Sequence, residues 1–327
     1  MGPRADKHDD VYDRQIRLWG ADAQKKMSNA SVLYINLTGV TCEIMKNLVL
    51  AGVAAVVCDS RPYPEAVREM PCSFFPAEQM EAASKNGSSC NTVAKSVKEA
   101  VEELNPLLAG RNAIEERPIA ELPDDYFTQF DAIVASRLTV EEAKRISASL
   151  QKVEEGKLFI VTDTFGFDGC AHLDFGANHK YRRELGKDKL SDLMTLDPYL
   201  SMADMMSVPL EGAKGRWDKS VPRILVLHRL LMDYWGLAEK TDFVKYAQDW
   251  LAVEKISSSV LTSDVQCSSL DTLAAIAQHP EVSPVCAVLG GILGNEVIKS
   301  LTGKGEPANN VMLFSGFDGG CRSFLLK

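Results

Sequence analysis

The chain has 327 residues, of which 46% are hydrophobic and 25% are charged, and this ordinary globular composition excludes an intrinsically disordered protein. Its 36 basic and 45 acidic side chains give a formal net charge of −9, which argues against a general binder of nucleic acid or of anionic membranes. A chain of this length accommodates one large α/β domain with an insertion, or two domains.

The first half of the sequence alternates between runs typical of buried strands and runs with helical periodicity. The predicted strands lie at residues 31–36, 54–59, 130–136 and 157–163. The predicted helices lie at residues 42–52, 91–106 and 140–153. Alternation of this kind predicts a parallel, doubly wound sheet of the Rossmann-like α/β class.

The pattern changes near residue 178. Residues 179–282 begin with a charged segment and continue with runs that predict helices without intervening strands. From residue 283 onward, an apolar helix is followed by two strand-like runs around a Gly-Gly turn. We therefore divide the chain into a domain over residues 1–178, a mainly helical insertion over residues 179–282, and a return to the first domain over residues 283–327.

Three glycines, Gly290, Gly291 and Gly294, lie within the apolar helix predicted after residue 283. Glycine is unfavourable inside a helix, so the three together indicate close packing against another backbone. The sequence leaves open whether that backbone belongs to the domain's own sheet or to a partner subunit.

The turn after the first predicted strand lies where a Rossmann-like fold binds phosphate. Such turns are rich in glycine, because backbone N–H groups at the start of the next helix must approach the phosphates closely. Here the turn begins at Asn36 and retains one glycine, Gly39, while the side chains of Thr38 and Thr41 would crowd a phosphate. The sequence therefore favours a structural turn over a nucleotide-binding loop.

Asp59 follows the second predicted strand, at the place where an acid binds the ribose in dinucleotide-binding folds. Without the glycines, two interpretations stay open. Asp59 is a relic of such a site, or it is the N-cap of a helix.

The eight cysteines are scattered and form no CxxC pair, which disfavours a structural zinc site. Four of the histidines, His172, His179, His228 and His279, are far apart with no metal-ligand spacing, so no metal site is expected. Cys267 is the one cysteine in a polar loop of the insertion, but its neighbourhood is poor in lysine and gives no activation of the thiol. With no apolar leader and no long apolar run, we expect an intracellular protein that does not enter a membrane.

Several segments together resemble one family. They are YDRQIRLWGADAQKKM near the start, the strand–turn–helix SVLYINLTGVTCEIMKNLVLAG, and PVCAVLGGILGNEVIKSL near the end. The chain resembles the ThiF-like E1 enzymes that activate ubiquitin-like proteins, and among them the small, Aos1-type subunits of heterodimeric SUMO-activating enzymes. The resemblance covers about residues 10–175 and 283–327, and the region between them matches poorly.

This resemblance implies a division of labour between two subunits. A large, Uba2-type partner binds ATP and Mg²⁺, adenylates the C-terminal glycine of a SUMO-like modifier and carries the catalytic cysteine. The small subunit is a pseudo-symmetric copy, and the arginine of its YDRQ motif reaches the partner's ATP phosphates. That arginine is Arg14 here, while Arg17 is a second candidate or the ion-pair partner of Asp13. The resemblance further implies a location in the nucleus and cytoplasm.

By the same resemblance, the chain's own nucleotide positions are degenerate. Cys72 replaces an arginine, Cys90 replaces a lysine, and Leu138 falls where active members carry a metal-binding aspartate. With the altered turn and Asp59, these changes predict that ATP and Mg²⁺ do not bind in this chain's own cleft. The isolated chain is then inactive.

Three alternatives remain. The first is the equivalent subunit of a NEDD8-activating E1, which usually carries a much larger insertion. The second is a homodimeric sulfur-carrier adenylyltransferase, and the third is an NAD-dependent oxidoreductase. The last two need a glycine loop of their own, which this turn lacks.

Overall fold

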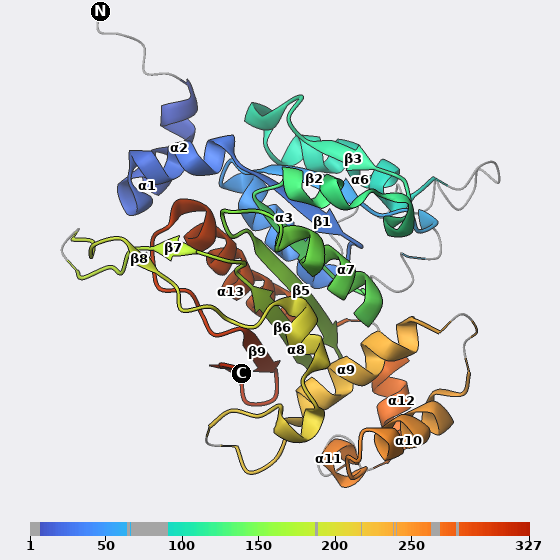
Figure 1. Cartoon of the computed structure of the whole chain (residues 1–327). Helices are drawn as coiled ribbons and strands as arrows, with labels where there is room; N and C mark the ends of the chain where they lie inside the picture. The colour runs from blue at the N-terminus through green and yellow to red at the C-terminus, as the bar shows by residue number, and fades with distance from the viewer. Residues whose placement is uncertain are drawn as a thin grey trace, which may run out of the picture.

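The computed structural model describes residues 7–63, 66, 91–186, 189–216, 218–237, 239, 241–262, 269–278 and 281–327. An eight-stranded sheet lies at the centre, with the strand order β10-β9-β6-β5-β4-β1-β2-β3 (Figure 1). Its strands are β1 (Ser31–Ile35), β2 (Ala54–Cys58), β3 (Ala113–Glu115), β4 (Ala132–Ala135), β5 (Leu158–Phe165), β6 (Asp168–Asp174), β9 (Val311–Ser315) and β10 (Gly320–Phe324).

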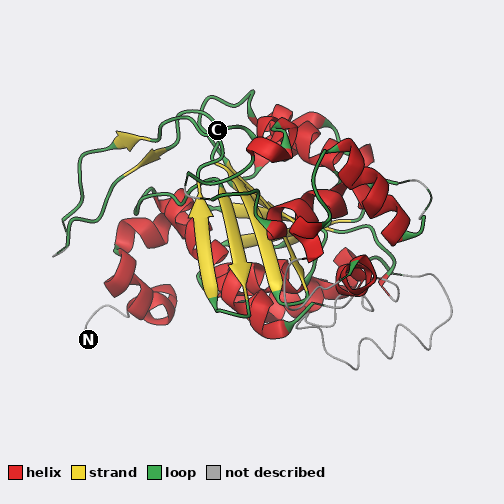
Figure 2. Cartoon of the chain, turned by 90° about the horizontal axis from the view of Figure 1, so that it is seen from below, coloured by secondary structure: helices red, strands yellow, loops and turns green. Residues whose placement is uncertain are grey.

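Helices cover both faces of this sheet (Figure 2). The described α-helices are α1 (Lys7–Trp19), α2 (Ala21–Asn29), α3 (Gly39–Leu50), α6 (Val93–Leu104), α7 (Val140–Leu150), α8 (Met202–Ser207), α9 (Arg223–Trp235), α10 (Phe243–Val253), α11 (Ser259–Thr262), α12 (Leu270–Gln278) and α13 (Ser283–Thr302). The prediction of a doubly wound α/β fold is confirmed.

The sheet is parallel in one half only. β3, β2, β1, β4 and β5 run parallel, as the strand–helix alternation predicts. β6, β9 and β10 are antiparallel to their neighbours, so the parallel arrangement predicted for the first half of the sequence does not extend to these three strands. The physical reason is the short turn at Gly166, which has a φ of 59° and joins β5 directly to β6 without a crossover helix.

Strand β1 shows how the sheet builds two cores. Val32 and Tyr34 belong to the core under α3, α6 and α13, while Leu33 and Ile35 belong to the core under α7, α8, α9 and α10. Successive side chains of a strand point to opposite faces, and here both faces are buried. A strand covered on both sides needs a continuous apolar run, which is the pattern that predicted it.

The region over residues 179–282 is mainly helical, as predicted, but it is not free of strands. β7 (Lys180–Tyr181) and β8 (Met194–Thr195) form a small antiparallel pair, which the sequence did not indicate. Helices α9 and α10 contribute to the same core as α7 and the central sheet. The three-part division of the chain stays a prediction.

The glycines of α13 differ in their surroundings. A Cβ atom at Gly290 would lie 2.6 Å from the Cβ of Glu43 and 3.2 Å from the carbonyl oxygen of Val40, both in α3. Nothing lies within 4 Å of a Cβ at Gly291, and Gly294 has only ordinary contacts. Close backbone packing is therefore confirmed at Gly290, where the neighbour is another helix of this chain.

Within the described residues, α13 is the one helix long and apolar enough to cross a membrane by length and composition. Half of its apolar window is buried inside the fold. Its packing against α3 is that of the core helix of a globular domain, which passes the same test.

Candidate functional site

Helix α1 is fixed to the domain by its inward side chains. Tyr12 is buried, and its hydroxyl oxygen accepts a hydrogen bond from Asn105 Nδ2 at 2.7 Å. Gln15 Nε2 donates to the carbonyl oxygen of Leu50 at 3.3 Å. A Cβ at Gly52, whose φ is +93°, would lie 3.0 Å from the Tyr12 hydroxyl, so glycine is needed there. These contacts determine which face of α1 points outward.

The outward face of α1 carries Arg14 between two exposed apolar side chains. Val11 and Leu18 are 62% and 76% exposed, and they lie three residues before and four residues after Arg14. Side chains at these spacings share one face of a helix. Arg14 is itself exposed, and no described residue forms a hydrogen bond or an ion pair with it.

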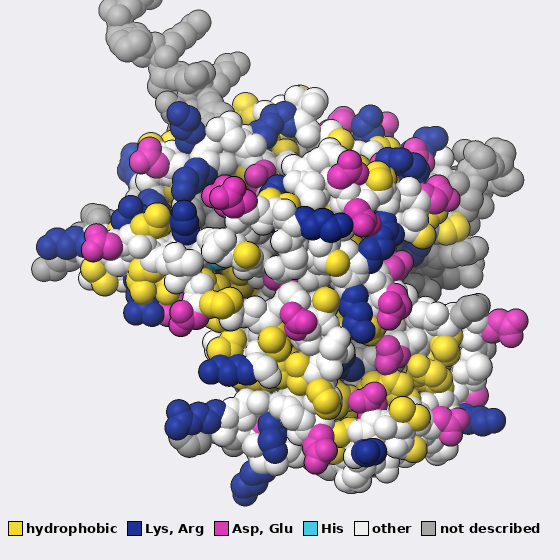
Figure 3. Space-filling model, in the orientation of Figure 1, with side chains coloured by type: hydrophobic (Ala, Val, Ile, Leu, Met, Phe, Trp, Pro, Cys, Tyr) yellow, Lys and Arg dark blue, Asp and Glu magenta, His cyan; other side chains and the backbone are white. Residues whose placement is uncertain are grey.

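Arg17 has a partner within the helix. Its Nη2 atom lies 3.0 Å from Asp13 Oδ2, and its Nε atom donates to Asp13 Oδ1 at 3.2 Å. This is the pairing that the sequence left as one alternative for Arg17. Lysine and arginine side chains are also gathered on the surface around α1 and α2 (Figure 3).

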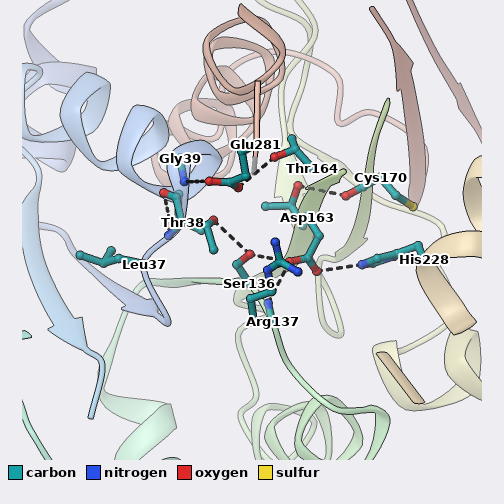
Figure 4. A network of polar contacts seen from close by, with 12 residues as sticks. Leu37, Thr38, Gly39, Ser136, Arg137, Asp163, Thr164, Cys170, His228 and Glu281 are labelled. Atoms are coloured by element: carbon teal, nitrogen blue, oxygen red, sulfur yellow. Dashed lines mark hydrogen bonds and ion pairs between the residues drawn. The ribbon is translucent and has the colours of Figure 1, made fainter. Parts of the chain in front are cut away.

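The phosphate turn at the start of α3 is filled by groups of the chain itself. The N–H of Gly39 donates to Glu281 Oε2 at 2.5 Å, and the Thr164 hydroxyl donates to Glu281 Oε1 at 2.9 Å (Figure 4). Burial raises the pKa of the Glu281 carboxyl, an effect that nearby Arg137 opposes. A carboxylate thus lies at a helix N-terminus, the kind of place where Rossmann-like folds bind phosphate.

The two threonines of this turn are buried and hydrogen-bonded. The N–H of Thr38 donates to Thr41 Oγ1 at 2.8 Å, as in a capping box. Thr38 Oγ1 donates to Ser136 Oγ at 3.1 Å, and Ser136 Oγ donates to Asp163 Oδ1 at 2.6 Å. Asn36, which begins the turn, has a left-handed φ of 55°. The side chains therefore occupy the space that glycines would leave to a phosphate.

Asp59 is wholly buried and engaged with groups of the chain. Its Oδ2 atom accepts the N–H of Leu37 at 2.8 Å and lies 2.7 Å from Arg61 Nη2. Its Oδ1 atom accepts Arg61 Nε at 2.9 Å. The N-cap of α6 is Thr92, so Asp59 does not cap that helix. A ribose would have to compete with Arg61 for this carboxylate.

The remaining predicted positions are either apolar or undescribed. Leu138 is fully buried in the core beside α7 and offers no metal ligand. Cys72, Cys90 and Cys267 lie outside the described residues.

A cavity of about 270 Å³ lies next to the turn and is lined by arginines that already have partners. Arg61 is paired as described, Arg117 Nη2 lies 2.7 Å from Glu115 Oε2, and the Arg137 guanidinium lies 4.7 Å from the ring centre of Trp235. Ligand pockets usually measure about 300–1,000 Å³. The cavity is small for a nucleotide, and its cations are engaged.

Two histidines that are distant in sequence lie together on the other face of the sheet. The rings of His172 and His228 are stacked, with their centroids 5.2 Å apart. The expectation that the histidines lie far apart is wrong for this pair, because α9 packs over β6.

Curated relatives match the chain over nearly its whole length. It is 30% identical over 321 residues to SUMO-activating enzyme subunit 1B-1 of Arabidopsis thaliana, with 94% of this chain and 93% of that protein covered. The chain belongs to the SUMO-activating enzyme subunit 1 family. It is 29% identical to subunit 1 of Danio rerio and 26% identical to that of Homo sapiens, each covering 94% of this chain and 92% of the relative. No protein-family model matches the chain.

For this member of the subunit 1 family, sequence reasoning missed two residues of the filled turn. Arg61 had a local signal, because an arginine two residues after a strand-ending acid can fold back onto it. Glu281 had none, since 242 positions separate it from Gly39 and no periodicity connects them.

Proposed function

We propose that this chain is the small subunit of a heterodimeric E1 that activates a SUMO-like modifier, and that Arg14 acts on ATP bound by the large partner. The partner adenylates the modifier's C-terminal glycine and carries the catalytic cysteine. Membership of the SUMO-activating enzyme subunit 1 family supports the pathway. The observation that carries the role of Arg14 is its exposed guanidinium on an anchored helix, with no partner in the described part of the chain.

The chemistry of adenylation fits an arginine at this place. Forming an acyl-adenylate concentrates negative charge on the α-phosphate and on the departing pyrophosphate. A planar guanidinium pairs with phosphate oxygens through two parallel hydrogen bonds. Because Tyr12 and Gln15 already hold α1, little reorganisation is needed when the arginine meets a phosphate.

The side chains next to Arg14 fit an interface with a partner subunit. Val11 and Leu18 are exposed apolar side chains on the same face of α1. An apolar border around a charged group excludes water once the surfaces meet, and this strengthens the pairing of the charge. We therefore place the large subunit against this face of α1.

The filled turn supports ATP and Mg²⁺ binding in the partner and not in this chain. A phosphate at the start of α3 would have to displace the Glu281 carboxylate from the Gly39 N–H. The Asp59–Arg61 pair and the buried Leu138 remove a ribose contact and a metal ligand. The isolated chain is then inactive, and we place the working heterodimer in the nucleus and cytoplasm.

Two measurements test this function. ATP binding to the purified chain alone should be undetectable by calorimetry, and micromolar affinity would contradict the filled-site argument. The chain should co-purify with the large subunit of a SUMO-activating enzyme and restore SUMO-dependent ATP–pyrophosphate exchange. Preferential capture of the NEDD8-pathway large subunit would favour the NEDD8 alternative instead.

A further inference from the structure

A buried cluster of potential metal ligands lies between β6 and α9. Cys170 and His172 are two residues apart on β6 and therefore point to the same face of the sheet. His228 comes from α9, which packs on that face. The Cys170 sulfur and one ring nitrogen from each histidine all lie within 4.8 Å of one another, and all three side chains are wholly buried.

The hydrogen bonding of His228 determines which nitrogen is available. Its Nε2 atom lies 2.9 Å from Asp163 Oδ2 (Figure 4). Asp163 Oδ1 also accepts hydrogen bonds from Ser136 Oγ and the Arg137 N–H, so the side chain of Asp163 acts as an acceptor here. The Nε2 atom therefore carries the hydrogen, and Nδ1 keeps a lone pair that no described residue uses. Histidines that bind metals are commonly held in this way, with a carboxylate on the outer nitrogen.

His172 differs from His228 in its hydrogen bonding. No described residue hydrogen-bonds to either of its ring nitrogens. Burial lowers the pKa of His172 well below its ordinary value, and the nearby His228 and Arg229 act in the same direction. A neutral imidazole has a lone pair on one nitrogen in either tautomer. Buried polar atoms are normally paired, and a metal ion here would pair one of these nitrogens on each histidine.

We propose that Cys170, His172 and His228 bind a transition-metal ion of the zinc class. One sulfur and two imidazole nitrogens are the donors that Zn²⁺ prefers, whereas Mg²⁺ and Ca²⁺ prefer oxygen. Asp163 holds His228 in the tautomer that leaves Nδ1 free to coordinate. Three protein ligands leave one tetrahedral position for water or another small ligand.

The geometry requires only a small adjustment. Zn–S and Zn–N bonds of about 2.3 and 2.0 Å place the donors of one tetrahedral ion roughly 3.5 Å apart. One donor atom from each of the three side chains lies within 4.8 Å of the other two, so side-chain rotations that move the donor atoms by about an ångström bring them to this spacing. On binding, the Cys170 thiol gives its proton to solvent, and the positive charge of the metal ion stabilises the resulting thiolate.

Cobalt spectroscopy on the untagged full chain tests the proposal. After treatment with a chelator, titration with Co²⁺ should give one equivalent of bound ion with an intense sulfur-to-cobalt absorption, which Zn²⁺ then removes. Cys170→Ala should abolish this absorption, and His172→Phe should weaken Co²⁺ binding by about tenfold or more. Cys42→Ala is the matched control, because Cys42 is equally buried but lies in the other core, and it should behave like the wild type.

Two outcomes would overturn the site. One is a folded wild-type chain that gives no sulfur-to-cobalt absorption, and the other is an absorption that survives in Cys170→Ala. A chain with a substituted buried residue can fail to fold. X-ray absorption spectroscopy of the zinc-loaded wild type therefore tests the ligand set without any substitution. One sulfur and two nitrogens support the site, whereas a shell without sulfur or with several sulfurs contradicts it. None of these readouts depends on ATP chemistry, so they stand apart from the proposed function.

Discussion

The Glu281 carboxylate accepts the backbone N–H of Gly39 at 2.5 Å, so that a side chain of this protein holds the N-terminus of α3. A helix N-terminus attracts anions, because its N–H groups are unpaired and the helix dipole is positive there. The chain supplies that anion internally. The N-terminus of α3 is therefore stabilised by the chain itself.

Two substitutions of Glu281 distinguish the contribution of its hydrogen bonds to stability from the contribution of its charge. Glu281→Ala leaves the buried Gly39 N–H without its partner and leaves the Thr164 hydroxyl with the weaker contact to Cys286 Sγ at 3.4 Å, which should cost about 1–3 kcal/mol of unfolding free energy. Glu281→Gln keeps an acceptor for Gly39 and removes a charge that burial disfavours, so we expect a loss below about 1 kcal/mol. Urea denaturation measures both, and equal losses would show that the charge itself matters.

The Asp59–Arg61 ion pair should contribute far more to the free energy of unfolding than a similar ion pair at the surface does. Arg61→Ala leaves the buried Asp59 carboxylate without its main partner and should cost about 3 kcal/mol. Arg117 and Glu115 have the same two-residue spacing, but the Arg117 side chain is exposed, and Arg117→Ala should cost no more than about 1 kcal/mol. Denaturant titrations compare them, and similar losses would argue against a structural role for Asp59.

The two adjacent glycines of α13 should respond in opposite directions to alanine. Gly290→Ala places a methyl group against Glu43 and the Val40 carbonyl, and such overpacking should cost about 1–3 kcal/mol. Gly291→Ala meets open space and should gain about 0.5–1 kcal/mol from helix propensity. Thermal unfolding of the two variants tests this. A Gly290→Ala chain as stable as the wild type would mean that α3 shifts away from the added methyl group at little cost in free energy.

His179 should make the fold less stable in mild acid. It is buried against Phe175, and burial lowers the pKa of its ring to about 4. As the pH falls below about 6.5, the unfolded chain takes up this proton and the folded chain does not, so the free energy of unfolding falls by up to about 1.4 kcal/mol per pH unit. Above about pH 6.5 the His179 ring is neutral in both the folded and the unfolded chain, so this loss of stability is absent there.

Urea denaturation at about pH 7 and pH 5.5, for the wild type and for His179→Phe, measures the share of this residue. Phenylalanine does not titrate, so the variant should lose less stability between the two conditions. Other buried groups titrate equally in both proteins and cancel in the comparison. An identical pH dependence would exclude His179 as the cause.

The sequence predicts what depends on local pattern. The parallel strands β1, β2, β4 and β5 follow from apolar runs that alternate with helices, because a strand buried on both faces needs such a run. β6 has the segment DGCAHLD, in which glycine and polar residues interrupt the run, and it was missed. Its direction depends on the turn at Gly166, which periodicity does not report.

Contacts between distant segments could not be predicted in the same way. The meeting of His172 with His228 depends on which face of α9 lies on β6, and this is decided by packing. For Arg14, the motif predicted the residue, whereas the exposure of its side chain depends on how Tyr12 and Gln15 anchor α1. The pairing of Arg17 with Asp13 was foreseeable from the spacing of four residues alone.

The rate of ATP–pyrophosphate exchange by the assembled heterodimer tests the role of Arg14 most directly. Arg14→Ala should slow exchange by roughly a hundredfold to a thousandfold while the two subunits still assemble, as expected for an arginine supplied across an interface. Arg17→Ala is the matched control, because Arg17 is already paired with Asp13 one turn along α1, and it should stay within a few-fold of the wild type. An intact Arg14→Ala heterodimer that exchanges at the wild-type rate would contradict the account.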